Sequence, residues 1–164
     1  MMKIALVPGT FDPITKGHLD VIERASKIFH EVVVAVAASE NKNPLFDLET
    51  REQLARNATA HMNNVSVVTF NDLLVDVAKR QHAHIVVKGL RAVTDFEYEF
   101  QLTALNYKMD SSLETFFIMS PPNYMYLSSS VVREIARHGG PIGEFVTDEV
   151  ASALHNKYFG PKCN

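Results

Sequence analysis

The stretch KIALVPGTFDPITKGHLD, from Lys3 to Asp20, combines a buried strand, a turn with two glycines and the start of a helix. An unbroken apolar run covers positions 4–7, which is typical of a central parallel strand that is covered on both faces. Pro8 and Gly9 are expected to end this strand. Apolar residues spaced three and four apart follow from Leu19 to Phe29, and this spacing predicts an amphipathic helix.

His18 is expected at the N-terminus of that helix, where unpaired backbone N–H groups and the positive end of the helix dipole favour anions. Gly9 and Gly17 would let ligand atoms approach the backbone closely. Together these features predict a phosphate-binding turn. The alternative is an ordinary strand-to-helix turn that Thr15 caps.

The rest of the chain repeats this strand–helix order. Strands are expected at Lys3–Val7, Val32–Ala38, Val65–Thr69, Ile85–Lys88 and Thr115–Met119, with helices between them at Leu19–Phe29, Leu48–Thr59, Leu73–Arg80 and Phe96–Met109. A short helix near Val131–Arg137 and a last helix over Asp148–Tyr158 follow. The alternation predicts a Rossmann-like three-layer α/β fold around a five-stranded parallel sheet, with residues 1–164 forming one domain.

The composition restricts the classes of partner. The chain has 19 acidic residues against 16 Lys and Arg and contains no basic block, so neither nucleic acid nor an anionic membrane is an expected partner. No apolar stretch approaches the ~20 residues of a membrane span, and the first residues lack the pattern of a leader. We therefore expect a cytoplasmic protein. The lone Cys163 has no partner for an internal disulfide.

Polar and charged residues follow the predicted strands at the edge where α/β sheets bind ligands. Lys88 ends an apolar run, so its charge would lie at a buried rim and need an anion. Arg91 suits phosphate, although a structural pair with Asp95 or Glu97 is the alternative. Lys42 follows the second strand, or it is simply a solvated loop charge. The GxGxxG and GxxxxGK[ST] motifs are absent, which disfavours simple NAD binding and P-loop ATP hydrolysis.

Three further patterns in the sequence bear on its structure and function. The run Ser128–Ser130 before Val131 predicts a helix cap together with a second anion site, because a cap alone uses one serine. The aromatic residues of Phe96–Met109 fit a helix by length, and most are expected in the core or at a subunit interface. His82 and His84 lack a third ligand nearby, so a surface pair is favoured over a metal site.

Taken together, these motifs resemble bacterial phosphopantetheine adenylyltransferase, within the nucleotidylyltransferase superfamily and its TxGH type. The resemblance runs through nearly the whole chain. It is carried by PGTFDPITKGH at 8–18, AAS with a lysine at 37–42, KGLRAVTDFEYE at 88–99, Asn106, and LSSSVVRE at 127–134. TxGH alone is typical of the superfamily, whereas DFEYE with the triple serine points to this family.

The resemblance implies transfer of the adenylyl group of ATP to 4'-phosphopantetheine, with Mg²⁺ accompanying ATP, in a homohexamer that coenzyme A inhibits. The implied catalytic residues are His18, Lys42 and Arg91, and the implied phosphopantetheine ligands are Thr10, Lys42, Leu74 and Lys88. The implied ATP ligands are Thr10, Phe11, His18, Gly89, Leu90, Arg91, Glu99, Tyr124, Met125, Tyr126, Leu127, Ser128, Ser129 and Ser130. No protein ligands for a metal are implied.

Two positions depart from the family: many members have Arg where this chain has Lys88, and Lys where it has Asn43. Lys88 keeps the charge but lacks the bidentate fork of a guanidinium, which affects the expected affinity for phosphopantetheine. Rival functions are a nucleotidylyltransferase acting on nicotinamide mononucleotide or on glycerol phosphate with CTP, and a noncatalytic nucleotide-binding subunit. A pyrophosphate-release assay separates them.

Overall fold

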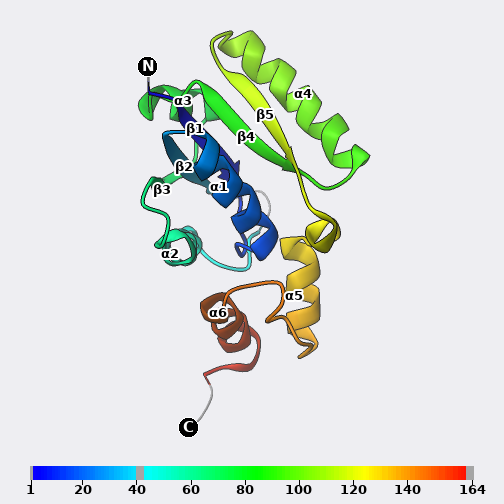
Figure 1. Ribbon diagram of the computed structural model, residues 1–164. Helices are drawn as coiled ribbons and strands as arrows, with labels where there is room; N and C mark the ends of the chain where they lie inside the picture. The colour runs from blue at the N-terminus through cyan, green and yellow to red at the C-terminus, as the bar shows by residue number, and fades with distance from the viewer. Residues whose placement is uncertain (1, 40–42, 162–164) are drawn as a thin grey trace.

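The computed structural model describes residues 2–39 and 43–161. Five parallel strands form one sheet in the order β3-β2-β1-β4-β5 (Figure 1). The strands are β1 (Ile4–Gly9), β2 (Glu31–Ala37), β3 (Val65–Phe70), β4 (Ile85–Leu90) and β5 (Glu114–Met119). The helices are α1 (Lys16–Ile28), α2 (Leu48–Thr59), α3 (Leu74–Arg80), α4 (Val93–Met109), α5 (Ser129–Arg137) and α6 (Asp148–Phe159), with a 3₁₀ turn, η2, at Pro122–Tyr124. The predicted Rossmann-like α/β fold is confirmed.

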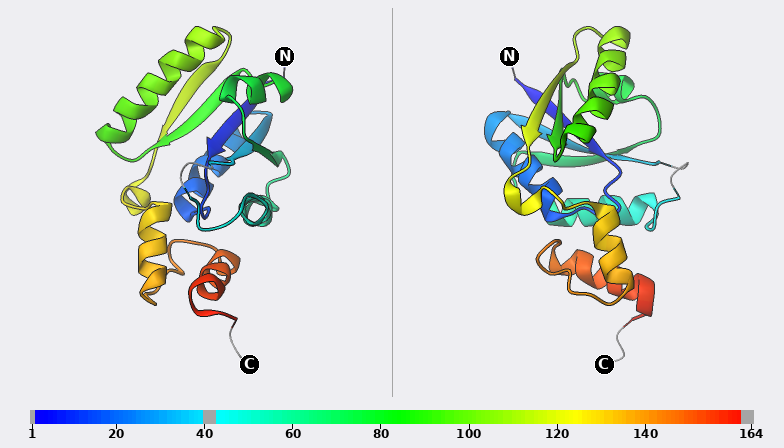
Figure 2. Two further views of the ribbon diagram at one scale, coloured as in Figure 1. Left: turned by 180° about the vertical axis from the view of Figure 1, so that it is seen from behind. Right: turned by 90° about the vertical axis from the view of Figure 1, so that its right-hand side faces the viewer.

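Helices cover both faces of the sheet because the central strands contain unbroken apolar runs. Ala5 and Val7 of β1 pack into one core with α1, α2, α5 and α6, while Leu6 between them packs into a second core with α3. The same alternation holds along β2. Side chains of successive strand residues point to opposite faces, so an unbroken apolar run supplies both cores. Figure 2 shows α4 beside β4 and β5, and α5 and α6 at the opposite end of the molecule.

The expected end of β1 was wrong. The strand continues through Pro8 and Gly9, which pair with Ala35 and Val36 of β2. On its other side β1 pairs with β4 at Ala5 and Leu6, and the two strands pair no further. Proline lacks an N–H, so it is tolerated where one side of a strand is unpaired. The separation of β1 from β4 after Leu6 opens the sheet at its carboxyl edge.

The helices begin within three residues of the expected positions, and α1 and α4 depart most: α1 begins at Lys16 rather than Leu19. Helix α4 begins at Val93 rather than Phe96, and the Asp95 carboxylate in its first turn accepts from the backbone N–H of Arg91 at 3.2 Å. A carboxylate is favourable near a helix N-terminus. Thr15 caps α1, as the alternative interpretation of this turn expected, since its hydroxyl accepts from the N–H of His18. In the described ranges, no helix has both the length and the apolar character to cross a membrane.

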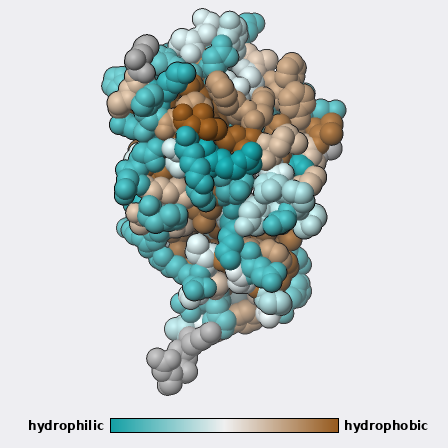
Figure 3. Space-filling view, viewed as in Figure 1, coloured by the Kyte–Doolittle hydropathy of each residue, from teal (hydrophilic) through white to brown (hydrophobic). Residues whose placement is uncertain are grey.

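The aromatic side chains of α4 are exposed, so the part of the prediction that placed them in the core was wrong for this chain. Phe96, Tyr98 and Phe100 are 42%, 59% and 58% exposed, and β5 adds Phe116 at 49%. Figure 3 shows apolar side chains gathered on the surface over α4 and β5. A large exposed apolar patch marks an interaction site in soluble proteins.

Candidate active site

A cleft of about 430 Å³ opens where β1 and β4 separate. The chain runs from β1 outward to β2 and β3 and then returns to place β4 on the other side of β1, so the strand order reverses here. Ligands bind beyond the carboxyl ends of strands at such a switch point. The predicted site residues that line the cleft are Thr10, Phe11, His18, Leu74, Lys88, Gly89, Arg91, Glu99, Tyr124 and Leu127.

Other predicted site residues do not line the cleft. Leu90 is buried in the core, while Met125 and Tyr126 are 46% and 77% exposed outside it. Lys42 lies outside the described residues, and its role stays a prediction.

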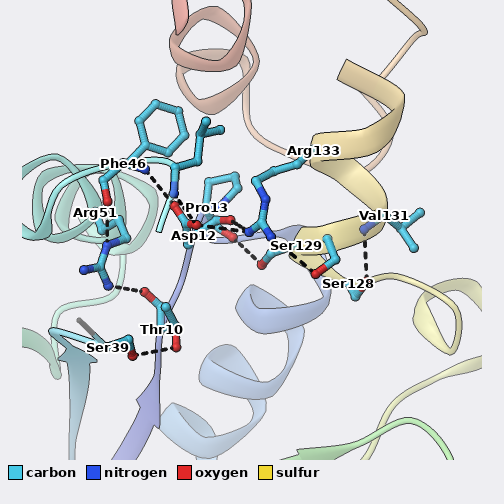
Figure 4. A network of polar contacts seen from close by, with 12 residues as sticks. Thr10, Asp12, Pro13, Ser39, Phe46, Arg51, Ser128, Ser129, Val131 and Arg133 are labelled. Atoms are coloured by element: carbon cyan, nitrogen blue, oxygen red, sulfur yellow. Dashed lines mark hydrogen bonds and ion pairs between the residues drawn. The ribbon is translucent and has the colours of Figure 1, made fainter. Parts of the chain in front are cut away.

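The three serines also lie beyond the cleft lining, at the start of α5 (Figure 4). The Ser128 hydroxyl accepts from the Val131 N–H, which confirms the predicted cap. The Ser129 hydroxyl donates to the Pro13 carbonyl at 2.7 Å, and that of Ser130 accepts from Arg133 at 3.4 Å. Each hydroxyl thus has a partner within the chain, and the role of the serines as ATP ligands stays a prediction.

Several lining residues were not assigned from the sequence. They are Ser39, Phe70 and Ser120, which follow or end β2, β3 and β5, and Tyr98 and Leu102 on α4. The first three obey the strand-end rule that located Thr10 and Lys88, so the rule could have found them. Tyr98 and Leu102 flank Glu99 on one side of α4, and a helical spacing of four relates them.

His18 is held in one tautomer by the N-terminal turn of α1. The backbone N–H of Thr15 donates to Nδ1 at 3.0 Å, and the Thr15 hydroxyl lies 3.0 Å from the same atom. Because Nδ1 accepts, the proton of the neutral ring is on Nε2. Burial, together with the charge of Arg91, lowers the pKa of His18 to about 4. The ring is therefore a neutral N–H donor in the cleft at pH 7.

We expect nitrogen-15 NMR to report a neutral His18 ring protonated at Nε2 between pH 8 and pH 5. Its pKa lies below the ordinary value of 6.5, so the unfolded chain binds the proton more readily. The contribution of His18 to stability is therefore complete above about pH 6.5 and is lost as the pH falls through about 4. The His18→Ala spectrum assigns the signal, and a ring that titrates near pH 6.5 would contradict this assignment.

Lys88 faces a carboxylate of the chain itself. Its Nζ lies 3.1 Å from Oε2 of Glu99, and the two side chains are 18% and 20% exposed. This contact is an ion pair and not a hydrogen bond. Oε2 of Glu99 is buried and has no hydrogen-bond partner among the described residues. The expectation that this cation needs an anion is met within the chain by Glu99. A bound phosphate would share the Lys88 charge with that carboxylate.

Arg91 forms the structural pair that the sequence left open. Its Nε lies 3.1 Å from Oδ2 of Asp95, and its Nη2 lies 3.4 Å from Oδ1. Its Nη1 donates to the carbonyl of Leu127 at 3.0 Å, which ties the β5–α5 connection to the end of β4. The guanidinium therefore lines the cleft in a fixed orientation. Its charge is close enough to His18 to help lower the pKa of that ring.

Gly89 allows α1 to pack against β4 beside these side chains. A Cβ at position 89 would lie 2.8 Å from Cγ2 of Val21, which is closer than side chains approach one another. Gly9 has a similar role, because its Cβ would meet the ring of Phe11 at 2.9 Å. The sequence predicted that Gly9 leaves room for a ligand to approach the backbone. In the structure, the ring of Phe11 lies against the backbone at Gly9, so glycine is needed there to make room for that ring.

A buried polar network braces the turns around the cleft (Figure 4). Asp12 is 4% exposed and accepts from the backbone N–H groups of Leu45 and Phe46 at 2.8 and 2.9 Å. It also pairs with Arg133 at 3.1 Å, which links these turns to α5. The sequence gave no sign of this network, because its partners are 33 or more positions apart.

The cleft thus presents a neutral imidazole donor and two cations where a helix N-terminus meets the ends of two strands. Donors and cations in this arrangement stabilise charge that develops on a phosphoryl group. Among the described residues, no three His, Cys, Asp or Glu side chains lie close enough to hold a metal ion.

Solved structures of other proteins share this fold. A protein described as a nicotinate-nucleotide adenylyltransferase from Vibrio parahaemolyticus superposes with a TM-score of 0.73 at 20% identity, over 99% of this chain and 98% of the other. The nicotinic acid mononucleotide adenylyltransferase of Plasmodium falciparum, complexed with NaAD, gives a TM-score of 0.69 at 18% identity, over 96% and 98%. At this identity the likeness establishes the fold.

The sequence itself matches a family model. The model, described as cytidylyltransferase-like, covers residues 6–135, which run from within β1 through β5 and include all the cleft residues discussed above. The chain therefore belongs to the cytidylyltransferase-like family, within the nucleotidylyltransferase superfamily.

Proposed function

We propose that this protein transfers the adenylyl group of ATP to 4'-phosphopantetheine, forming dephospho-coenzyme A and pyrophosphate. The observation that carries the reaction type is the neutral His18 donor beside Lys88 and Arg91 in the cleft between β1 and β4. The choice of acceptor is supported by the motif resemblance, above all by DFEYE and the triple serine. Leu74, Phe70 and Leu102 give one side of the cleft an apolar lining that suits a pantetheine arm.

The acceptor is a phosphate monoester that is already ionised near neutral pH, so the reaction needs no general base and no protein nucleophile. An oxygen of that phosphate attacks the α-phosphorus of ATP, the bond to the β-phosphate bridging oxygen breaks, and pyrophosphate leaves with the electron pair. His18 donates from Nε2 to an α-phosphate oxygen, while Lys88 and Arg91 offset the charge of the two polyanions. Lys42 has the same role in this proposal.

Mg²⁺ belongs to the proposal as part of the ATP complex. The described residues offer no resident site for it, and the triphosphate oxygens supply ligands of the type that Mg²⁺ prefers. Bound in that way, the ion would offset charge on the triphosphate. Glu99 and the backbone near Gly89 are the proposed contacts for the rest of the nucleotide.

A pyrophosphate-release assay tests the proposal. ATP is supplied with 4'-phosphopantetheine, nicotinate mononucleotide or nicotinamide mononucleotide, and CTP is supplied with glycerol phosphate. We expect phosphopantetheine with ATP to give the highest kcat/KM. Nicotinate mononucleotide is the second candidate acceptor, because both structural neighbours are described as enzymes of that nucleotide. Faster turnover of nicotinate mononucleotide would replace the proposed acceptor, and no release with any pair would refute the enzymatic proposal.

MgATP is expected to raise the melting temperature. A ligand that binds only the folded state stabilises it by about 2.7 kcal/mol at a hundredfold excess over Kd, which is several degrees for a chain of this size. Differential scanning fluorimetry with and without ATP, using MgCl₂ alone as the control, measures the shift. An unchanged curve at millimolar MgATP would argue against nucleotide binding in the cleft.

We propose that coenzyme A inhibits the protein by binding the acceptor part of the cleft.

We also propose a homohexamer built on the exposed apolar surface of α4 and β5. Light scattering should give six chains of 18.4 kDa, or about 110 kDa. Phe100→Glu should dissociate the assembly, because it places a charge on that surface. Ile28→Glu is the matched control, since Ile28 is 63% exposed on α1. Wild-type protein that is monomeric at micromolar concentration would remove the proposal.

A further inference from the structure

Arg51 of α2 is a buried guanidinium whose described acceptors are all main-chain carbonyls. The residue is 1% exposed. Nε donates to Phe46 at 3.0 Å, Nη1 donates to Thr10 at 2.8 Å and to Ala37 at 2.6 Å, and Nη2 donates to Ala38 at 2.9 Å. Burial lowers the pKa of Arg51, because the charge is held away from water, and the charges of Asp12 and Asp47 offset only part of this effect. A buried charge without a paired carboxylate is costly, so some gain must offset it.

Two of these carbonyls, those of Thr10 and Ala38, lie in the turns that follow β1 and β2. The carbonyl of Ala37 ends β2, and that of Phe46 lies just before α2. Thr10 precedes Phe11, which has φ of 48°, and Ala38 precedes Ser39, which has φ of 54°. Residues other than glycine rarely adopt this left-handed conformation, and it persists where surrounding contacts enforce it. The guanidinium therefore donates hydrogen bonds to the residue directly before each of two strained residues. Both strained residues line the cleft.

The side chains of Thr10 and Ser39, one from each of these two turns, meet in the cleft. The hydroxyls of Thr10 and Ser39 lie 3.0 Å apart, and the ring of Phe11 packs edge-on against His18 with centroids 5.1 Å apart (Figure 4 for the hydroxyls). A shift of the Thr10 carbonyl would thus move one hydroxyl and, through Phe11, the imidazole. Arg51 itself does not line the cleft.

We propose that Arg51 is a positioning residue for nucleotidyl transfer, which fixes the spacing of the Thr10 and Ser39 turns and the orientation of His18. The proposal rests on the proposed function only in taking the cleft as the site of transfer. A lysine at this position would keep the charge, but its single nitrogen cannot span carbonyls that three guanidinium nitrogens now reach. Replacing Arg51 by lysine therefore tests whether the several hydrogen bonds of the guanidinium are needed, or only its positive charge.

The test compares Arg51→Lys and Arg51→Gln with Arg56→Met. Arg56 lies on the same helix, is 48% exposed in its side chain and pairs with Glu52, so it is the matched control. Displacement of reacting groups by about 1 Å can cost ~100-fold. For folded Arg51→Lys we expect kcat to fall by about 10- to 100-fold with KM for ATP changed less than threefold. Arg56→Met should keep wild-type kcat.

Each other outcome decides the matter. A folded Arg51→Lys with kcat within threefold of wild type, or an equal loss in Arg56→Met, overturns the proposal. Arg51→Gln needs no buried charge and covers the case in which the lysine variant does not fold; if neither variant folds, Arg51 is a folding residue and the proposal fails. If wild type turns over no acceptor, the proposed function fails separately. NMR of His18 then decides, because positioning predicts a changed ring signal in Arg51→Lys but not in Arg56→Met.

Discussion

His18→Ala is expected to lower kcat by about 10²–10³-fold, with much smaller changes in KM. In the proposed reaction, Nε2 of His18 donates to the α-phosphate, on which negative charge grows as the transition state forms. A preorganised neutral donor of this kind stabilises the transition state more than bound ATP. The Thr15 N–H holds Nδ1 and so keeps the proton on Nε2 before substrate arrives.

The same ring also closes the capping box of α1, so stability must be measured beside activity. Loss of a capping contact costs about 1 kcal/mol of stability. Thr147→Ala is the matched control, because it removes the hydroxyl that caps α6 through the N–H of Val150, outside the cleft. We expect both variants to melt at a lower temperature and only His18→Ala to lose kcat. A well-folded His18→Ala with near-normal kcat would refute the catalytic assignment.

The sequence predicted the fold well because its strongest signals are local. Apolar runs located β1 to β5 to within two residues at either end, and spacing of three and four located the helices. The end of β1 was missed for a non-local reason, since whether Pro8 can lie in a strand depends on the β4 side being unpaired there. The sequence left open whether Phe100 lies in the core or at a subunit interface, because an apolar helical residue has the same pattern whether a sheet or another chain covers it.

In the candidate site, too, residues marked by a local sequence signal were predicted, and a residue whose role depends on distant parts of the chain was not. Strand-end position located Thr10, Lys88 and Arg91, because topology brings the carboxyl ends of parallel strands together. Arg51 could not be found, since it lies in a helix rich in charged residues, where an arginine is ordinarily solvated. Its burial depends on turns up to 41 positions away.

Replacing Lys88 is expected to impair use of the acceptor far more than use of ATP. Lys88 lies in β4, two residues before its end at Leu90, and its ammonium is beside the buried Oε2 of Glu99, so its removal takes away a cation and also exposes incoming phosphate to an uncompensated anion. Removing one donor to developing charge costs about 2–4 kcal/mol. Lys88→Ala should therefore lower kcat/KM for phosphopantetheine by roughly 30- to 1,000-fold.

The loss in Lys88→Ala has two parts, the missing cation and the repulsion between Glu99 and phosphate, and a Glu99 variant separates them. Lys88→Ala with Glu99→Gln removes both charges, so the double variant should recover the part of the loss that arises from repulsion between Glu99 and phosphate. Lys88→Arg should stay active, because a guanidinium supplies the same charge and adds a fork that suits phosphate. Steady-state kinetics with one substrate varied at a time measures each term. If Lys88→Ala affected both substrates equally, or neither, Lys88 would be a structural partner of Glu99 and the acceptor phosphate would have to be held elsewhere in the cleft.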